Sequence, residues 1–158
     1  MERSVTAEEV VAAFLGAGAT VATAESLTAG LVAAALADVP GASGMLRGGV
    51  VSYASEVKAG ILGVSEQLLA EAGSVNPHVA AQMAEGARRV CGADYGVSTT
   101  GVAGPDAHDG KPVGTVYVAV AGPERTETQE FTFEGNRAEI RAAARDAALR
   151  ALLAGLMI

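Results

Sequence analysis

The sequence is poor in the residue types that most often carry catalysis or cross-links. Its 158 residues include one cysteine, two histidines, two lysines and no tryptophan. The single cysteine, Cys91, excludes an intrachain disulfide and a cysteine metal cluster. Because the chain has only two histidines and two lysines, each of them can be considered separately as a candidate catalytic residue.

Aromatic residues are also scarce, at 4% of the chain, although half of all residues are hydrophobic. Alanine, valine and leucine must therefore fill the core, and their small side chains let helices lie close to a sheet. This composition favours a layered α/β domain. A chain of this length suits one hydrophobic core, so we expect a single domain over residues 1–158.

The charge balance excludes several classes of partner. A net charge of −7 argues against a general binder of nucleic acid or anionic membranes, because both would be repelled. The mean hydropathy is +0.32, but the uncharged stretch Ser26 to Ala37 is 12 residues long, below the ~18 needed to span a bilayer. Residues 1–9 carry four charges and do not resemble a signal peptide. We expect a cytoplasmic protein that contacts neither membrane nor nucleic acid.

The first half of the chain has the pattern of a parallel strand–helix–strand unit. Thr6 and Glu9 have the spacing of a capping box, which predicts a helix that glycines 16 and 18 end. Its predicted apolar face comprises Val10, Val11, Phe14 and Leu15. A strand over Thr20–Ala24, a helix over about Thr28–Asp38 and a strand over Leu46–Tyr53 follow.

The second half continues the alternation and ends in a hairpin. Asn76 and Pro77 begin a helix, whose predicted buried stripe comprises Val79, Met83, Ala87 and Val90. A strand over Tyr95–Thr100 precedes two hairpin strands, over Val113–Ala121 and Arg125–Phe133. Asn136 caps a final helix. Interleaved strands and helices of this kind predict a three-layer α/β/α sandwich on a mixed, mostly parallel sheet.

Ser26 is the first candidate for chemistry. It lies where a buried strand gives way to a helix, a position at which a serine either caps the helix or acts as a nucleophile near unpaired amides. The neighbouring Glu25 is either an ordinary carboxylate at the end of a strand or a group that orients a cation in the site.

A nucleophilic serine needs a proton acceptor, and histidine is the usual one. His78 falls in the first turn of a helix and His108 in a polar loop, and neither accompanies a G-x-S-x-G turn. These placements disfavour a serine–histidine–aspartate triad.

Lys58 is the alternative base. It follows the second strand, so that Lys58 and Ser26 can meet at the carboxyl edge of a parallel sheet. A lysine serves as a base if burial or a neighbouring cation lowers its pKa from ~10.4. Otherwise Lys58 is a solvated helix residue paired with Glu56. Tyr53, at the end of the same strand, either covers the core or relays a proton between Ser26 and Lys58.

Two further groups could bind a ligand. Thr100 and Gly101 begin a glycine-containing turn after a strand, either an ordinary turn or a place where a ligand approaches the backbone. Arg137, Arg141 and Arg145 recur every four residues on the last helix, either as a solvated face or as a phosphate site.

Several segments match one family in the correct order along nearly the whole chain. They are Ala24–Gly30, Gly48–Tyr53 with Lys58, Met83–Gly86, Thr100–Pro105 and Lys111–Val116. On these segments the chain resembles the CinA C-terminal domain family, which includes stand-alone nicotinamide-mononucleotide amidohydrolases of the PncC type. Two departures are Ala29, where many members carry glycine, and the loop from Asp106 to Gly110.

The resemblance implies hydrolysis of the carboxamide of nicotinamide mononucleotide, giving nicotinic acid mononucleotide and ammonia without a metal or cofactor. It implies that Ser26 is the nucleophile and Lys58 its base, that Tyr53 and Thr100 complete the site, and that Arg141 contacts the substrate. We also assign Glu25, Gly101 and Arg137 to substrate binding and expect a homodimer. The alternative is a nucleotide-binding regulatory domain that has kept this fold without turnover.

Overall fold

The computed structural model describes residues 4–157 and contains one five-stranded sheet. The strands lie in the order β2-β1-β3-β4-β5, with β1, β2 and β3 parallel to one another and β4 antiparallel to both of its neighbours. Four strands thus run in one direction and β4 runs in the other. Their bounds are β1 Val21–Glu25, β2 Leu46–Val51, β3 Tyr95–Gly101, β4 Thr115–Ala121 and β5 Thr126–Thr132.

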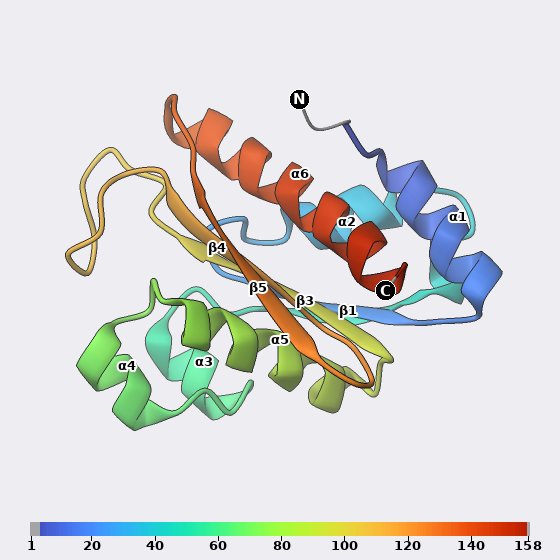
Figure 1. Ribbon diagram of the computed structural model, residues 1–158, viewed down its shortest axis with the longest axis horizontal. Coiled ribbons are helices and arrows are strands. Elements are labelled where there is room, and N and C mark those ends of the chain that lie inside the picture. The colour runs from blue at the N-terminus through green and yellow to red at the C-terminus, as the bar shows by residue number, and fades with distance from the viewer. Residues whose placement is uncertain (1–3, 158) are drawn as a thin grey trace.

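Helices cover both faces of this sheet, which confirms the predicted three-layer sandwich (Figure 1). On one face lie α1 (Ala7–Ala17), α2 (Leu31–Ala37) and α6 (Arg137–Leu156). On the other lie α3 (Ser55–Gly60), α4 (Glu66–Ala72) and α5 (Pro77–Cys91). A 3₁₀ turn, η1 (Ala42–Gly44), precedes β2.

Small residues set the spacing between these layers. A Cβ atom on Gly96 of β3 would lie 2.1 Å from the carbonyl oxygen of Ala84 in α5. On the other face of α5, a Cβ on Gly86 would lie 2.2 Å from the carbonyl oxygen of Leu62. Gly96 therefore allows α5 to pack against the sheet at backbone contact distance, and Gly86 allows the segment after α3 to approach α5 equally closely.

The structure corrects several details of the predicted elements. Leu15 and Val90 are exposed, at 43% and 48%, so the buried faces of α1 and α5 are narrower than predicted. Helix α4 was not predicted. Helix α2 begins at Leu31 with Gly30 as its N-cap, so Ser26 is not the cap of that helix.

The parallel strands β1, β2 and β3 end at one edge of the sheet, and the segments that follow them lie together there. These are the turn over residues 26–30, the connection from Ser52 to Ala54 and the long loop over residues 102–114. Within residues 4–157, no helix is long and apolar enough to cross a membrane.

Candidate active site

Ser26 and Lys58 meet at this edge of the sheet. Ser26 directly follows β1, and Lys58 lies in α3, which follows β2. The Nζ atom of Lys58 lies 3.0 Å from the Oγ atom of Ser26, within the range for direct proton transfer. The structure thus brings together the two candidate residues, each of which follows one of two neighbouring parallel strands.

Lys58 is held by three acceptors. Besides Ser26 Oγ, its ammonium group donates to the carbonyl oxygens of Ser52, at 2.7 Å, and Tyr53, at 3.1 Å. Only 1% of Lys58 is exposed. Burial lowers the pKa of Lys58 from 10.5 to about 8, while the negative charges of Asp109 and Glu56 act in the opposite direction.

This arrangement suits a lysine that loses one proton. An ammonium group has three N–H donors, and a neutral amine has two donors and one lone pair. If the two donors stay with the carbonyls of Ser52 and Tyr53, the lone pair faces Ser26 Oγ. Deprotonation therefore turns Lys58 into a base aimed at the serine without moving either side chain.

The carboxylate of Glu25 holds the turn that follows Ser26. It accepts hydrogen bonds from Val32 N at 2.8 Å, Ala33 N at 3.1 Å and Thr28 Oγ1 at 2.7 Å. It is buried and does not line the cavity described below, so its geometry does not fit the predicted contact with substrate. It also occupies the first amides of α2, which therefore do not hold charge that develops at Ser26.

Arg141 of α6 holds the same turn from the opposite side. Its Nε donates to the carbonyl of Leu27 at 2.8 Å, and its Nη2 donates to the carbonyl of Thr28 at 3.2 Å. Arg141 does not line the cavity beside Ser26, in contrast to the substrate contact that the resemblance implies. The third arginine of the row, Arg145, pairs with Asp146 on the same helix.

A cavity of about 340 Å³ opens beside Ser26. Its walls include the predicted residues Tyr53, Gly101 and Arg137. The Arg137 guanidinium donates to the Tyr53 hydroxyl at 2.8 Å and to the Gly104 carbonyl at 2.6 Å, and so links two other lining residues of the cavity. The Tyr53 hydroxyl thus lies with Arg137 rather than between Ser26 and Lys58, which touch directly.

Thr100 lies outside the cavity. Its side chain is buried and donates through Oγ1 to the carbonyl of Ser74 at 2.7 Å. Ser74 itself lines the cavity, and both its amide and its hydroxyl donate to Asp109 Oδ2 at 2.9 Å. Thr100 therefore supports one wall of the site instead of reaching a ligand.

Sequence reasoning missed four residues that build the site: Thr28, Ser74, Thr99 and Asp109. Thr28 and Thr99 share a hydrogen bond of 2.7 Å between their hydroxyls, and the Ser26 amide donates to the Thr99 carbonyl at 3.0 Å. Short polar side chains of this kind occur throughout the chain and carry no distinguishing pattern. Thr28 and Asp109 lay within segments that the sequence analysis had marked, but neither residue was singled out there.

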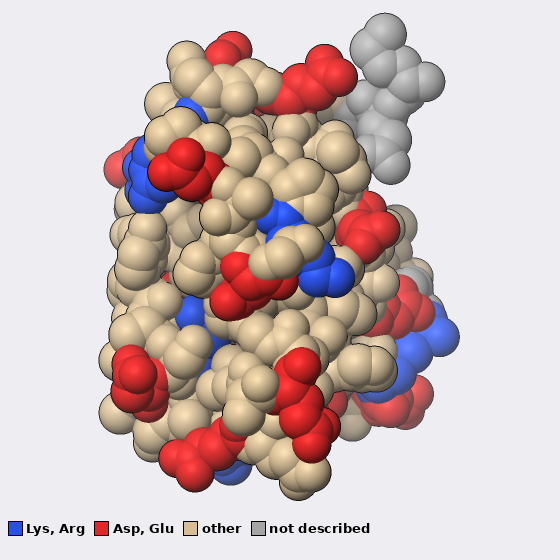
Figure 2. Space-filling view, turned by 90° about the vertical axis from the view of Figure 1, so that its left-hand side faces the viewer, with Lys and Arg blue, Asp and Glu red and all other residues tan. Residues whose placement is uncertain are grey.

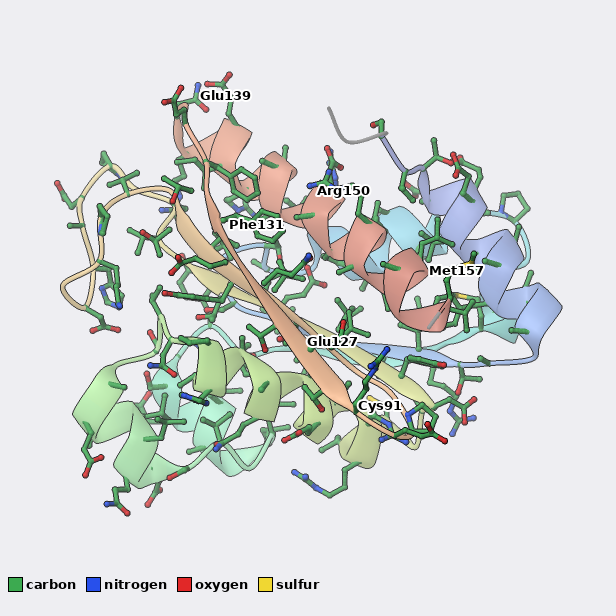
Figure 3. All side chains as sticks on the ribbon, in the orientation of Figure 1. Cys91, Glu127, Phe131, Glu139, Arg150 and Met157 are labelled. Atoms are coloured by element: carbon green, nitrogen blue, oxygen red, sulfur yellow. The ribbon has the colours of Figure 1, made fainter. Side chains whose placement is uncertain are left out.

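The site offers no metal centre in the described residues. Residues 4–157 contain no group of three histidine, cysteine, aspartate or glutamate side chains that could hold a metal ion. Cys91 lies at the end of α5, at the opposite end of the molecule from the loop that borders the cavity (Figure 3). On the side that carries this loop, acidic and basic side chains are intermingled, without a continuous basic band (Figure 2).

The fold and the site together define an α/β domain with a buried serine–lysine pair at a sheet edge. The family model described as "CinA C-terminal domain" matches residues 3–156, and the chain belongs to this family. It is 54% identical to a CinA-like protein of Frankia casuarinae over 141 residues, which is 87% of this chain and 33% of that protein. It is 50% identical to a CinA-like protein of Anaeromyxobacter dehalogenans over 144 residues, 90% of this chain and 35% of that protein.

Solved structures of the same superfamily share the fold. A CinA superfamily protein from Klebsiella pneumoniae has a TM-score of 0.92 and 33% identity, over 96% of this chain and 95% of that one. The competence/damage inducible protein CihA from Agrobacterium tumefaciens has a TM-score of 0.90 and 34% identity, over the full length of both chains. The chain spans about a third of the length of the curated relatives it matches.

Proposed function

We propose that this protein hydrolyses the carboxamide of nicotinamide mononucleotide, using Ser26 as nucleophile and Lys58 as base. The single observation that carries the proposal is the contact of 3.0 Å between Lys58 Nζ and Ser26 Oγ, made by a lysine that is buried among neutral acceptors. The substrate and products come from the resemblance to the family rather than from the geometry.

The first step is acyl transfer to Ser26. Neutral Lys58 takes the proton of the Ser26 hydroxyl while Oγ attacks the carboxamide carbon, and a tetrahedral oxyanion forms. The amides at the start of α2 are occupied by Glu25, and the Ser26 amide donates to Thr99. The backbone amides of Leu27 and Ala103, which line the cavity, are our candidates for stabilising the oxyanion.

The second step releases ammonia and regenerates the enzyme. Protonated Lys58 gives its proton to the departing nitrogen as the C–N bond breaks, which leaves an ester on Ser26. Neutral Lys58 then takes a proton from water as the water attacks this ester. The carboxylic acid forms, and the proton returns to Ser26 Oγ.

The cavity has features that suit a nucleotide with a cationic ring. Arg137 is the arginine that lines it, and a guanidinium group can pair with a phosphate through two hydrogen bonds. A pyridinium ring near Lys58 would further disfavour the ammonium form, because like charges repel. The arginine thus suits binding of the phosphate, and the ring charge favours the neutral form of Lys58 once the substrate is bound.

Ammonia release from nicotinamide mononucleotide tests the proposal. We expect turnover by the wild type, and losses of several powers of ten in kcat for Ser26→Ala and Lys58→Met. The matched control is Ser43→Ala, at an exposed serine in η1. Full turnover by Ser26→Ala would refute the covalent mechanism.

The same experiment separates the alternative that the family resemblance raised. A regulatory domain without turnover would bind the nucleotide, and this binding would raise the melting temperature of the protein. No ammonia would be released. A cytoplasmic location and a homodimeric state remain our predictions from the sequence.

A further inference from the structure

The loop that borders the cavity is fastened at one point to the segment between α4 and α5. A single oxygen of Asp109, Oδ2, accepts hydrogen bonds from both the amide and the hydroxyl of Ser74, each at 2.9 Å. Thr100 in turn holds Ser74, because the Thr100 hydroxyl donates a hydrogen bond to the Ser74 carbonyl. Asp109 and Ser74 thus connect the loop to the end of β3.

The backbone on both sides is shaped for this contact. Gly73 has φ +77°, and a Cβ atom there would lie 2.9 Å from both Cβ and Cγ of Asp109. Asp109 itself has φ 51°, in the left-handed region that few residues other than glycine adopt. Any larger residue at position 73 would push the carboxylate away from Ser74.

The fastened loop supplies much of the cavity wall. Residues 104–108 line the cavity together with Ser26, and Asp109 follows them directly in the chain. The backbones of His108 and Lys111 also pair with each other, which keeps the loop folded back on itself. Release of Asp109 from Ser74 would therefore loosen the wall against which a substrate packs.

We propose that Asp109 is a positioning residue, which clasps the 104–111 loop onto Ser74. The inference rests on the proposed function for its kinetic consequences, but the clasp itself is a property of the free protein. It assigns a role to a loop whose sequence departs from the pattern we noted for the family.

The charges around the two groups define what the carboxylate does to Lys58. Asp109 faces His108, with Nε2 3.3 Å from Oδ2, and also acts on Lys58. Lys58 is subject to the charges of Asp109 and of Glu56 on its own helix. The Asp109 charge stabilises the ammonium form and raises the pKa of Lys58, against the larger effect of burial.

Two variants separate the clasp from the charge. Asp109→Asn retains an oxygen that can accept from Ser74 but removes the negative charge. In this variant we expect the loop to stay closed and the acid limb of kcat/KM to move to lower pH. Asp109→Ala removes both, so we expect faster amide exchange at Ser74 and a KM raised about tenfold.

The test combines hydrogen–deuterium exchange of the free variants with pH profiles of ammonia release. Asp38→Asn, at an exposed aspartate after α2, is the matched control. It should change neither the amide exchange of the loop nor the pH profile of ammonia release. Unchanged exchange at Ser74 and in the loop in Asp109→Ala would overturn the clasp. An acid limb that does not move in Asp109→Asn would overturn the role of the charge.

The two proposals fail in different ways. A wild type that releases no ammonia refutes the proposed function, while the exchange experiment on the same protein still decides whether Asp109 holds the loop. If the wild type releases ammonia but Asp109→Ala leaves amide exchange in the loop unchanged, only the clasp is refuted.

Discussion

The three hydrogen-bond partners of the buried Lys58 are a hydroxyl and two carbonyl oxygens, all of them uncharged. A carboxylate in contact would fix the ammonium form and raise its pKa. Neutral acceptors satisfy the N–H groups while leaving burial as the main influence on the charge. The residue can therefore alternate between proton acceptor and proton donor near neutral pH.

The pH dependence of turnover follows from this environment. Because the neutral amine is the base, kcat/KM should rise about tenfold per pH unit below about 8 and level off above it. Initial rates of ammonia release between pH 6.5 and 9.5 measure the profile. A flat profile over this range would show that the titration of Lys58 does not limit the reaction.

The stability of the fold should depend on the same ionisation. The pKa of Lys58 is about 8 when folded and returns to 10.5 when unfolded, so between these values the unfolded chain binds more protons. Raising the pH through this window therefore stabilises the wild type, by about 3 kcal/mol in total. Below about 8 both states are protonated, and the contribution is constant.

Denaturant unfolding of the wild type and of Lys58→Met measures this effect, because other titrating groups cancel in the difference. The stability of the wild type relative to Lys58→Met should increase from pH 8 to 10.5. A difference that is constant over this window would mean that Lys58 is not buried in the folded protein.

Ser26 and Lys58 lie in contact, as the sequence led us to expect, whereas three other predicted side chains do not line the cavity. Ser26 and Lys58 follow neighbouring parallel strands, and topology alone brings such positions together. Glu25 and Thr100 belong to segments that carry the family resemblance, and Arg141 belongs to the arginine row of the last helix. Their side chains, however, turn toward α2, Ser74 and the Ser26 turn. A motif gives proximity along the chain, whereas the direction of each side chain depends on packing that the motif does not encode.

At the scale of elements, the turn after β1 is held between two helices. Glu25 ties it to the start of α2, and Arg141 ties it to α6. Ala29 within the turn has φ 47°, so a non-glycine residue adopts a left-handed conformation there. Such a conformation persists only where surrounding contacts fix it, and these two side chains provide them.

Loss of the Arg141 contacts should therefore affect the chemical step. In Arg141→Gln we expect kcat to fall about tenfold with KM little changed, since two charged hydrogen bonds to the Ser26 turn are lost. Arg145→Gln, one turn further along α6, is the control and should retain normal kinetics. A raised KM with unchanged kcat would instead indicate that Arg141 binds the phosphate of the substrate.

Helix α4 is the element that sequence patterns could not predict. None of its residues is fully buried, and the half-buried Leu68 and Leu69 that pack against the core make too short an apolar face to identify a helix. Its only clear signal is the cap at Ser65, whose side chain accepts from the amide of Leu68. The long helices α5 and α6 were predicted because their caps and buried faces agree.

At the scale of the whole molecule, the helices lie close to the sheet because few large side chains separate the layers. Gly96→Ala would place a Cβ atom within 2.1 Å of the Ala84 carbonyl, and α5 would have to move away from the sheet. We expect a loss of about 3 kcal/mol in the free energy of unfolding. Gly16→Ala in α1 is the control, because nothing lies within 4 Å of its Cβ and alanine favours a helix.

Thermal or denaturant unfolding of both variants decides the point. Gly96→Ala should be destabilised and Gly16→Ala slightly stabilised by the same chemical change. Equal effects at the two positions would contradict the close packing of α5 on the sheet.

The most direct test of the central claim is to trap the acyl-enzyme. The protein is mixed with nicotinamide mononucleotide, quenched in acid within milliseconds to seconds, and analysed by intact mass and peptide mapping. We expect a nucleotide ester on Ser26 that forms with the first turnover and is absent from Ser26→Ala. Turnover with the modification on another residue, or undiminished turnover by Ser26→Ala, would contradict this expectation.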